Sequence, residues 1–511
     1  MVQSSVLGRS SLLSVYRSSL RHPPPRCGLY VICRNGSNQS FRTISTTKRK
    51  IHASSTRPSS PTDSAILAAT ASVNPLPAEI PAESPPMAKS APLSVLPLST
   101  VLRNLATTSI SSSRILLPPS LAIMSVLAHS NHAILNPDKN PVLRWFLKKT
   151  FYAQFCAGEN ATEVRRTIDG LKKIGFTGVI LGYAREIVLT EAQTQNLSAC
   201  DQGSIAEECV RNEIRPWAAG TLETVSLARP GDFVALKFSG AGRQALYALK
   251  NRLPPPKHLR AAIDEICELA AARDVPLLFD AEQTAIQAGI DDWTLEYQRK
   301  YNKTPGHAII YGTYQAYLKS TPSTLSAHLA AAAKEDFTLG VKLVRGAYLG
   351  ADPRHIIHDT KSETDAAYNS LASSLICRQW GTALKTSTNT KFPRVSVVLG
   401  SHNLESVRRA RAIRDSAAAD KGTELAIAQL QGMADEVSCE LVYAAKLRRE
   451  KKGEVPRAYK YIVWGTTGEC MKYLLRRAYE NRDAVARTKS GRDAMWGEVR
   501  RRFWGVLGLG A

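Results

Sequence analysis

Eight short apolar runs, separated by helix-like segments, constrain the fold of this chain more than any other feature. Residues 260–274 and 404–415 are clear examples of the helical patterns between the runs. Continuous apolar strands that alternate with helices indicate a parallel sheet covered on its outer side. Eight of them predict an α/β fold of the (β/α)8 TIM-barrel type, with an open doubly wound sheet as the alternative. The runs are 177–186, 232–240, 275–283, 307–317, 339–350, 394–403, 424–433 and 459–469.

Polar residues at the ends of these runs predict the position of a functional site. In a barrel the carboxyl ends of the strands meet on one face, where active sites are built. A packed core would not end strand after strand with groups that need hydrogen-bonding partners. These residues are Lys237, Asp280, Gln283, Gln315, Arg345, Tyr348, His402, Asn403 and Gln429.

The segment YLLRRAYEN, residues 473–481, opens the helix after the last run and carries an unusual polar stripe. Tyr473, Arg476, Arg477 and Glu480 follow the i, i+3, i+4, i+7 spacing of one helix face. Two adjacent guanidinium groups can hold a carboxylate from both sides, and a nearby acid can position them. The alternative is a solvated basic face paired with Glu480.

The positive charge of the chain is concentrated at its amino terminus. The net charge is +23, and the first 150 residues hold 17 basic and 4 acidic residues, so the remainder is only mildly basic and no nucleic-acid partner is expected. Residues 1–60 contain ten Lys or Arg and no acid. This composition is typical of a mitochondrial transit peptide, and a disordered basic arm is the alternative. Residues 61–92 read as a disordered Pro/Ser/Ala-rich linker and 93–150 as a helical arm.

The cysteines and histidines do not indicate a metal site. Nine cysteines are scattered without a CxxC pair, which fits a reducing compartment and no disulfide framework. His355 and His358, with Asp352 and Asp359, read as a polar lid rather than as metal ligands. Two long stretches, 187–229 and 351–391, interrupt the barrel rhythm and are expected to be loop insertions.

The carboxyl-terminal residues 491–511 form a basic, amphipathic tail. Arg500, Arg501 and Arg502 stand beside Phe503 and Trp504. Such a segment can lie on an anionic membrane surface, and a helix capping the barrel is the alternative. No run of 18 apolar residues occurs, so no membrane-spanning helix is expected.

Six motifs resemble, in order, those of the proline dehydrogenases: FDAEQT, YQAYLKST, VKLVRGAYL, SHN, QLQGM and YLLRRAYEN. The resemblance assigns residues 151–490 to a distorted barrel that binds FAD without a covalent bond. It implies oxidation of L-proline to 1-pyrroline-5-carboxylate by hydride transfer from C5 to flavin N5. It further implies that electrons pass to a quinone such as ubiquinone, with the protein bound peripherally to the matrix side of the inner mitochondrial membrane. No GxGxxG follows a strand, so a Rossmann site for FAD is not expected.

The resemblance also implies a role for each matching residue. Lys237, Asp280 and Tyr461 are the expected catalytic residues, with Lys237 and Asp280 as partners. The expected proline-binding residues are Arg476, Arg477, Tyr473, Tyr348, Leu430 and Glu480. The expected FAD-binding residues are Gln315, Lys342, Arg345, Gly346, Ala347, His402, Asn403, Gln429 and Gly432.

Two alternative functions are left open by the sequence. A hydroxyproline dehydrogenase of the same fold is one, although the hydroxyproline-oxidising relatives look smaller at the position of Tyr461, which favours unsubstituted proline. A non-catalytic mitochondrial barrel protein is the other, and the presence of the expected catalytic residues argues against it.

Overall fold

The computed structural model describes residues 91–185, 193, 197–386, 390–450, 457–481 and 485–508. The predicted transit peptide and the predicted linker up to residue 90 lie outside the described residues. The side chains of residues 449, 450, 480, 481 and 485–487 lie outside them as well.

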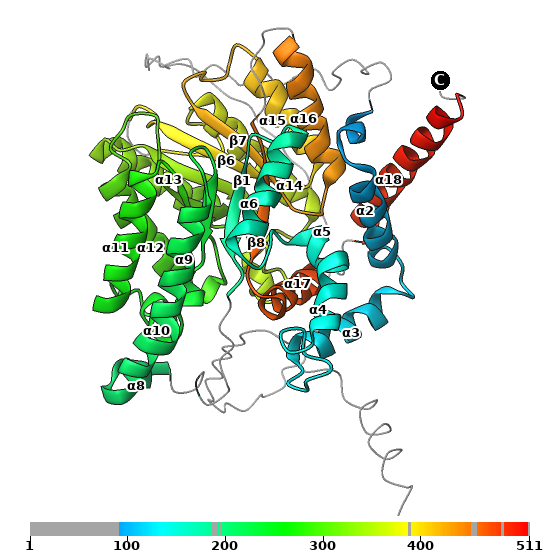
Figure 1. Ribbon diagram of the computed structural model, residues 1–511. Coiled ribbons are helices and arrows are strands. Elements are labelled where there is room, and N and C mark those ends of the chain that lie inside the picture. The colour runs from blue at the N-terminus through cyan, green and yellow to red at the C-terminus, as the bar shows by residue number, and fades with distance from the viewer. Residues whose placement is uncertain are drawn as a thin grey trace, which may run out of the picture. The chain divides into compact units, whose positions relative to one another are not determined.

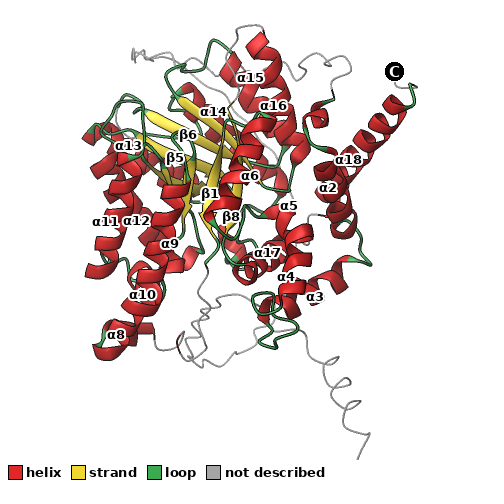
Figure 2. Cartoon of the chain, in the orientation of Figure 1, coloured by secondary structure: helices red, strands yellow, loops and turns green. Residues whose placement is uncertain are grey.

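Eight parallel strands close into a barrel in the order of the sequence (Figures 1 and 2). The barrel closes where β1 pairs with β8, from Gly178 opposite Tyr459 to Tyr183 opposite Trp464. The predicted barrel is therefore confirmed, and the open sheet is wrong. The strands are β1 Gly178–Tyr183, β2 Phe233–Leu236, β3 Leu277–Phe279, β4 Ile310–Gln315, β5 Leu339–Val344, β6 Val395–Gly400, β7 Glu424–Leu430 and β8 Arg457–Trp464.

Helices cover the outside of the barrel between successive strands. The two predicted loop insertions contain two of these helices, α9 and α14, so reading both stretches as loops was wrong. Short helices η3 Leu197–Asp201, α8 Gly203–Cys209 and η4 Val210–Ile214 precede α9, η5 Phe238–Ala241 precedes α10, and η6 Arg354–Ile356 precedes α14. The outer helices are α9 Arg215–Leu227, α10 Arg243–Lys250, α11 Lys257–Ala272, α12 Thr284–Tyr301, α13 Thr321–Glu335, α14 Lys361–Cys377, α15 Leu404–Asp415 and α16 Asp435–Glu450.

Aromatic side chains fill the interior of the barrel below its mouth. Phe233 contacts the rings of Tyr311 and Tyr459 edge-on, with centroids 5.6 and 5.1 Å apart. These residues belong to one buried cluster with inward-facing aliphatic residues from several strands. Because side chains alternate along a strand, residues two positions beyond this layer also face the interior, nearer the carboxyl ends. Asp280, Lys342 and Tyr461 occupy such positions.

Helix α6, Ala161–Ile174, takes the outer place that the helix after β8 would normally fill. Its residues Val164, Ile168 and Leu171 are buried in one cluster with residues of β1, β8, α9 and α16. The helix after β8, α17 (Thr467–Asn481), packs instead on α3 (Leu117–His129) and on η2 (Lys148–Tyr152). Figure 1 shows α17 beside α3 and α4 at one end of the barrel. Since a strand and its following helix are joined by a short turn, α17 lies near the carboxyl ends of the strands.

The predicted arm consists of helices outside the barrel. It contains η1 Pro92–Val95, α2 Leu98–Ser111, α3, α4 Pro141–Leu147, η2 and α5 Ala153–Phe155. The carboxyl-terminal segment forms α18, Val485–Val506, which packs along α2. Met495 of α18 is buried with Leu93 and Val101 of the arm. Among the described residues, no helix is long and apolar enough to cross a membrane.

Candidate active site

A buried ion pair lies at the carboxyl ends of β3 and β5. The Lys342 ammonium binds Asp280 Oδ1, and both side chains are more than nine-tenths buried. The hydroxyl of Tyr461, on β8, donates to Asp280 Oδ2 at 2.9 Å. Lys342 Nζ also lies 5.3 Å from the centroid of the Tyr461 ring. One carboxylate therefore joins three strands of the barrel.

The guanidinium pair of α17 lies close to this carboxylate group. Arg476 and Arg477 lie over the ring of Tyr473, at 5.7 and 5.5 Å from its centroid. Burial and the charge of Asp280 raise the pKa of Tyr461 well above its usual value, and the charge of Arg477 opposes that rise. Arg477, Tyr473, Tyr461 and Asp280 thus form one electrostatic group. The Glu480 side chain lies outside the described residues.

We expected Lys237 to be the partner of Asp280, and the ion pair that the structure records for Asp280 is the one with Lys342. Lys237, directly after β2, acts on a different acid, Glu282. Burial raises the pKa of Glu282, while the charge of Lys237 and a hydrogen bond from Ser239 lower it. The Ser239 amide donates to Glu282 Oε1 at 3.0 Å. The FDAEQT motif contains Glu282, but the sequence analysis assigned it no role.

Arg345 is held by residues that the sequence did not single out. Its guanidinium binds Asp365 Oδ1 at 2.5 Å and donates to Ser406 Oγ at 2.6 Å. It lies 4.7 Å from the centroid of the Tyr368 ring. Its Nε is buried and has no hydrogen-bond partner in the described part of the chain. This cation is thus fixed beyond the end of β5 with one donor available.

Several predicted cofactor-binding residues meet at the ends of neighbouring strands. Gln315 accepts from the Ala347 amide at 3.2 Å and donates to the Glu282 carbonyl at 3.4 Å. His402 Nε2 accepts from the Leu430 amide at 3.1 Å. These contacts connect the ends of β3, β4 and β5 with one another, and the end of β6 with that of β7.

Three other predicted residues mainly shape the loops around this surface. Asn403 caps α15 by accepting from the Ser406 amide at 3.1 Å. The Gln429 amide accepts from Ser438 at 2.9 Å and donates to the Ser401 carbonyl at 3.2 Å, so it braces the loop after β6. Tyr348 donates to the Ala281 carbonyl at 3.3 Å.

Two predicted glycines are required by the backbone. Gly432 has φ of +73°, and a Cβ there would lie 2.6 Å from the Gln154 carbonyl oxygen. Gly346 has φ of +143°, and its Cβ would lie 2.3 Å from the Tyr317 ring. Both conformations disfavour a side chain. The two glycines let the chain turn tightly at the ends of β5 and β7.

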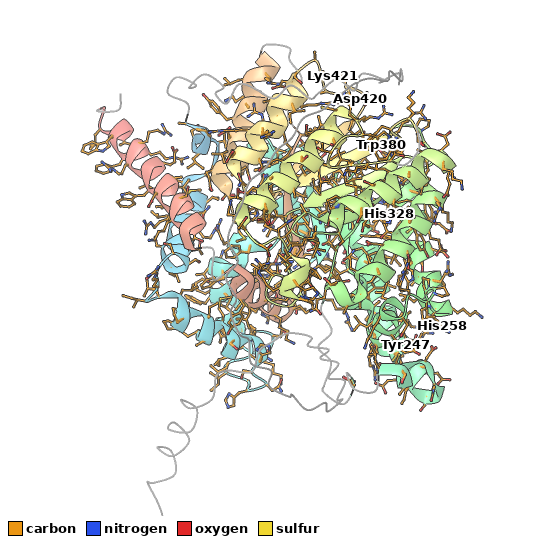
Figure 3. The ribbon with its side chains drawn as sticks, turned by 180° about the vertical axis from the view of Figure 1, so that it is seen from behind. Tyr247, His258, His328, Trp380, Asp420 and Lys421 are labelled. Carbon is orange, nitrogen blue, oxygen red and sulfur yellow. The ribbon has the colours of Figure 1, made fainter. Side chains whose placement is uncertain are left out.

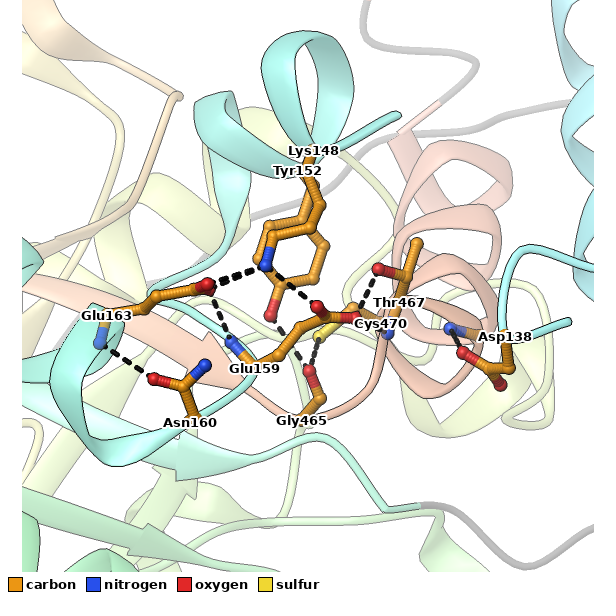
Figure 4. Close-up of polar contacts among 10 residues, drawn as sticks. Asp138, Lys148, Tyr152, Glu159, Asn160, Glu163, Gly465, Thr467 and Cys470 are labelled. Carbon is orange, nitrogen blue, oxygen red and sulfur yellow. Dashed lines mark hydrogen bonds and ion pairs between the residues drawn. The ribbon is translucent and has the colours of Figure 1, made fainter. Parts of the chain in front are cut away.

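Two carboxylates, Asp138 of the arm and Glu159 between α5 and α6, hold the amino end of α17 (Figure 4). Glu159 Oε1 accepts from the Thr467 amide at 2.9 Å and from its hydroxyl at 2.5 Å. Asp138 Oδ1 accepts from the Gly468 amide at 2.9 Å. Acids at a helix amino terminus satisfy free amides and complement the helix dipole. Lys148 binds Glu159 at 2.7 Å and so completes the support for the arginine-bearing helix.

No sequence pattern predicted this support. Glu159 lies in the segment FYAQFCAGEN, 308 residues before Thr467 in the first turn of α17. The only available signal was the GTTGE turn, whose amides need acceptors. Nothing in one sequence says which distant acid provides them.

Neither a metal cluster among the described residues nor a basic cavity at the other end of the barrel is a better candidate for the functional site. No group of His, Cys, Asp and Glu suited to a metal occurs among the described residues. Asp352 binds Tyr317 and the Thr284 amide, whereas Asp359 pairs with Lys319.

A cavity of about 220 Å³ is lined by Arg411, Lys421 and Arg457, among others. It lies at the amino ends of β7 and β8. Figure 3 shows Asp420 and Lys421 at that end, away from Tyr247 on α10.

The fold and this site define a β/α-barrel protein with a cluster of charged side chains at the carboxyl ends of its strands. A guanidinium pair, a buried ion pair and a fixed Arg345 surround the carboxyl ends of the strands. The proline dehydrogenase family model matches residues 164–490, and the chain belongs to this family.

Curated relatives agree with this assignment. The probable mitochondrial proline dehydrogenase of Schizosaccharomyces pombe is 30% identical over 403 residues, 70% of this chain and 80% of that protein. The hydroxyproline dehydrogenase of Bos taurus is 27% identical over 392 residues, 70% of this chain and 82% of that protein.

The crystal structure of proline utilization A from Bdellovibrio bacteriovorus, inactivated by N-propargylglycine, aligns with a TM-score of 0.55 at 16% identity. It covers 77% of this chain and 41% of that chain, and it shows a shared fold alone.

Proposed function

We propose that this protein oxidises L-proline to 1-pyrroline-5-carboxylate with bound FAD and passes the electrons to a quinone. The observation that carries the proposal is the pair Arg476 and Arg477 on a helix displaced to the carboxyl ends of the strands. The charge of Arg477 acts on Tyr461, which binds Asp280. A carboxylate held by the two arginines would present its ring to the inward-facing groups of the barrel.

The residues present fit FAD. Arg345 is a fixed cation whose buried Nε has no partner among the described residues, which suits a pyrophosphate or another anionic part of the cofactor. Gly346 and Gly432 permit close approach of the backbone. Gln315, Lys342, Ala347, His402 and Asn403 supply further polar groups, and Gln429 acts through the loop that it braces. When bound, FAD supplies the acceptor at N5 for the hydride that leaves C5 of proline.

The residues of the chain position proline and control one proton. Arg476 and Arg477 bind the carboxylate from both sides, with Glu480 as their support, while Tyr473, Tyr348 and Leu430 surround the ring. The proline nitrogen must be neutral before C5 can lose a hydride, because its lone pair forms the new C=N bond. Asp280 is the proposed acceptor of this proton, and Lys342 and Tyr461 hold its carboxylate in place. Lys237 maintains the positive potential next to Glu282.

Tyr461 selects the substrate in this proposal. Its hydroxyl is fixed on Asp280, so its ring cannot move aside for a larger substrate. A hydroxyproline dehydrogenase is among the relatives, which makes this the second candidate activity. We expect Tyr461→Ser to raise the kcat/KM for 4-hydroxyproline relative to that for proline. If the ratio does not change, Tyr461 does not determine the choice of substrate.

The proposed location is the matrix side of the inner mitochondrial membrane. Several relatives are named mitochondrial proteins. Residues 1–60 have the composition of a transit peptide, and a lipid-soluble quinone requires contact with the membrane surface. The basic tail at 491–511 is one proposed peripheral contact.

The experiment that tests the activity uses the FAD-loaded protein without oxygen. L-proline should bleach the flavin absorbance, and a quinone should restore it. Arg476→Met should raise the KM for proline by about 10²-fold or more, because a charged hydrogen bond to the carboxylate contributes about 2–3 kcal/mol or more. Protein that takes up no FAD, or flavin that proline does not bleach, would refute the enzyme activity. An unchanged KM would refute the arginine pair alone.

A further inference from the structure

The described residues expose large hydrophobic side chains in a very uneven way. Nineteen are exposed in total, and only Ile205, Leu253 and Leu349 lie in the barrel. Nine lie within residues 115–146 of the arm, and we call them the arm face. Its members are Ile115, Leu116, Ile123, Val126, Ile134, Leu135, Val142, Trp145 and Phe146.

Helix α3 is apolar on two opposite faces. Leu121, Met124 and Ala128 are buried, whereas Ile123 and Val126 point away from them and are 61% and 53% exposed. The helix contains no Lys, Arg, Asp or Glu. A helix that is apolar all round belongs in a core or in lipid.

Helix α4 repeats this arrangement next to α3. Val142, Trp145 and Phe146 are three and four residues apart, share one face and are each more than half exposed. Met124 of α3 and Leu147 of α4 are buried in the same cluster, and Figure 1 shows the two helices together. Because both helices turn their buried sides to this cluster, their exposed apolar sides face outward.

Cations surround the arm face. Residues 91–150 contain six Lys or Arg and one acid. A cavity of about 390 Å³ beside α4 is lined by Arg144, Trp145, Lys149 and Arg166, among others. Its two carboxylates, Glu159 and Glu163, are bound by Lys148, and no carboxylate of the described chain pairs with Arg144, Lys149 or Arg166.

We propose that the arm face docks on an anionic phospholipid bilayer, with the apolar side chains of α3 and α4 in the interfacial layer and a lipid phosphodiester in the cavity at Arg144, Lys149 and Arg166. Aromatic and aliphatic side chains next to Lys and Arg are the composition of an interfacial helix. Residues 91–150 carry three Lys and three Arg against one acid, and this positive charge complements an anionic lipid surface.

This surface is connected to the site. Helix α3 packs on α17, and Glu159, at the cavity, holds the amino end of α17. Docking through the arm would therefore bring the arginine-bearing end of the barrel close to the lipid, where a quinone resides. The proposed docking rests on the proposed electron transfer for its purpose. The evidence for docking is the exposed surface itself.

The test uses the FAD-loaded full chain and vesicles of phosphatidylcholine with or without phosphatidylglycerol. Ile123→Glu with Val126→Glu should weaken binding to the anionic vesicles by about tenfold or more, because the side chains can no longer enter the apolar layer. Arg144→Glu with Lys149→Glu should weaken it by about tenfold or more as well. Oxidation of proline with a soluble dye as acceptor should stay unchanged in both variants.

A spectroscopic readout removes the contribution of the basic amino terminus. Vesicles made with brominated lipids should quench tryptophan fluorescence less in Trp145→Phe than in the unaltered chain. Trp504→Phe, in α18, is the matched comparison because the tail is the other proposed contact, and quenching should fall more in Trp145→Phe than in Trp504→Phe. Leu253→Glu adds an acid to the surface of the barrel, and it is the control for the negative charge that the Glu variants of the arm introduce.

Each contrary result overturns the proposal. Unaltered binding in the Glu variants, or quenching that depends on Trp504 and not on Trp145, would move docking to the tail. A change from dimer to monomer with unaltered vesicle binding would make the arm face an interface between copies of the chain. Release by inorganic phosphate, beyond that by chloride at equal ionic strength, would assign the cavity to free phosphate. Loss of dye-linked activity in all proteins would refute the proposed oxidation and leave the docking result standing.

Discussion

Replacing Asp280 by Asn tests the central ion pair most directly. The substitution keeps the size of the side chain but leaves the Lys342 ammonium without a counter-charge in a site where both side chains are over nine-tenths buried. Removing one partner of a buried pair costs about 3–5 kcal/mol. Because the Asn oxygen can still accept from Tyr461 or Lys342, we expect about 3 kcal/mol of lost unfolding free energy.

The reverse change, Lys342→Met, should cost a similar amount. Among the described residues it leaves the buried Asp280 carboxylate with the Tyr461 hydroxyl, 2.9 Å away, as its side-chain donor. The double variant contains no buried charge at this site, so it should cost no more than either single change. A coupling free energy of about 3 kcal/mol follows, at the upper end of values for residues in contact.

Urea unfolding at saturating FAD measures these costs. With a slope of about 3 kcal/mol per molar, each single change should lower the midpoint by about 1 M. An FAD titration for each variant separates weaker cofactor binding from a weaker fold. Asp292→Asn is the matched control, because its pair with Arg252 is exposed on both sides, and it should cost less than about 1 kcal/mol.

Additive costs would refute this reasoning. If the double variant loses the sum of the two single losses, Asp280 and Lys342 do not act as one pair. Single losses no larger than that of Asp292→Asn would mean that water reaches the pair and that burial plays no part.

Three further predictions concern α17, a buried acid and a glycine. Arg477→Lys should raise the KM for proline by about tenfold, because an ammonium cannot form the bidentate contact, and an unchanged KM would remove Arg477 from the clamp. Burial raises the pKa of Asp291 from 3.8 to about 7, so the folded state binds more protons in that interval and stability falls as pH rises through it. Asp291→Asn should therefore raise the free energy of unfolding by about 1–4 kcal/mol at pH 8 and change it little at pH 4. Equal effects at the two pH values would contradict the raised pKa of Asp291. Gly432→Ala should lower the free energy of unfolding by about 1–3 kcal/mol. Gly170→Ala in α6, where a Cβ meets nothing within 4 Å, should be neutral or stabilising. Thermal melts compare the two variants, and equal shifts in the midpoint would show that the turn is not strained.

The barrel could be predicted because its signal is local. Each buried strand is a continuous apolar run between helical patterns, and eight repeats leave few alternatives. The stripe of Tyr473, Arg476 and Arg477 was visible for the same reason, since it depends only on helical periodicity. Two helices were misread as parts of loops, because α9 and α14 lie in stretches whose length hid the regular pattern.

Contacts between distant segments could not be predicted in this way. Asp280 was expected to pair with Lys237, on the neighbouring strand, yet it binds Lys342, two strands away. Whether two inward-facing residues meet depends on the stagger of the strands around the closed barrel, which one sequence does not display.

The sequence by itself determined the repeating strands, the polar residues at their ends and the arginine pair, because periodicity and residue type are properties of short segments. Only the tertiary structure decided where that pair lies. Helix α6 fills the outer place over β1 and β8, which leaves α17 to lie at the mouth, and Glu159 and Asp138 hold its first turn there. The physical reason is that a helix takes the position where its buried face and its free amides find partners, and here those partners come from the other end of the barrel sequence.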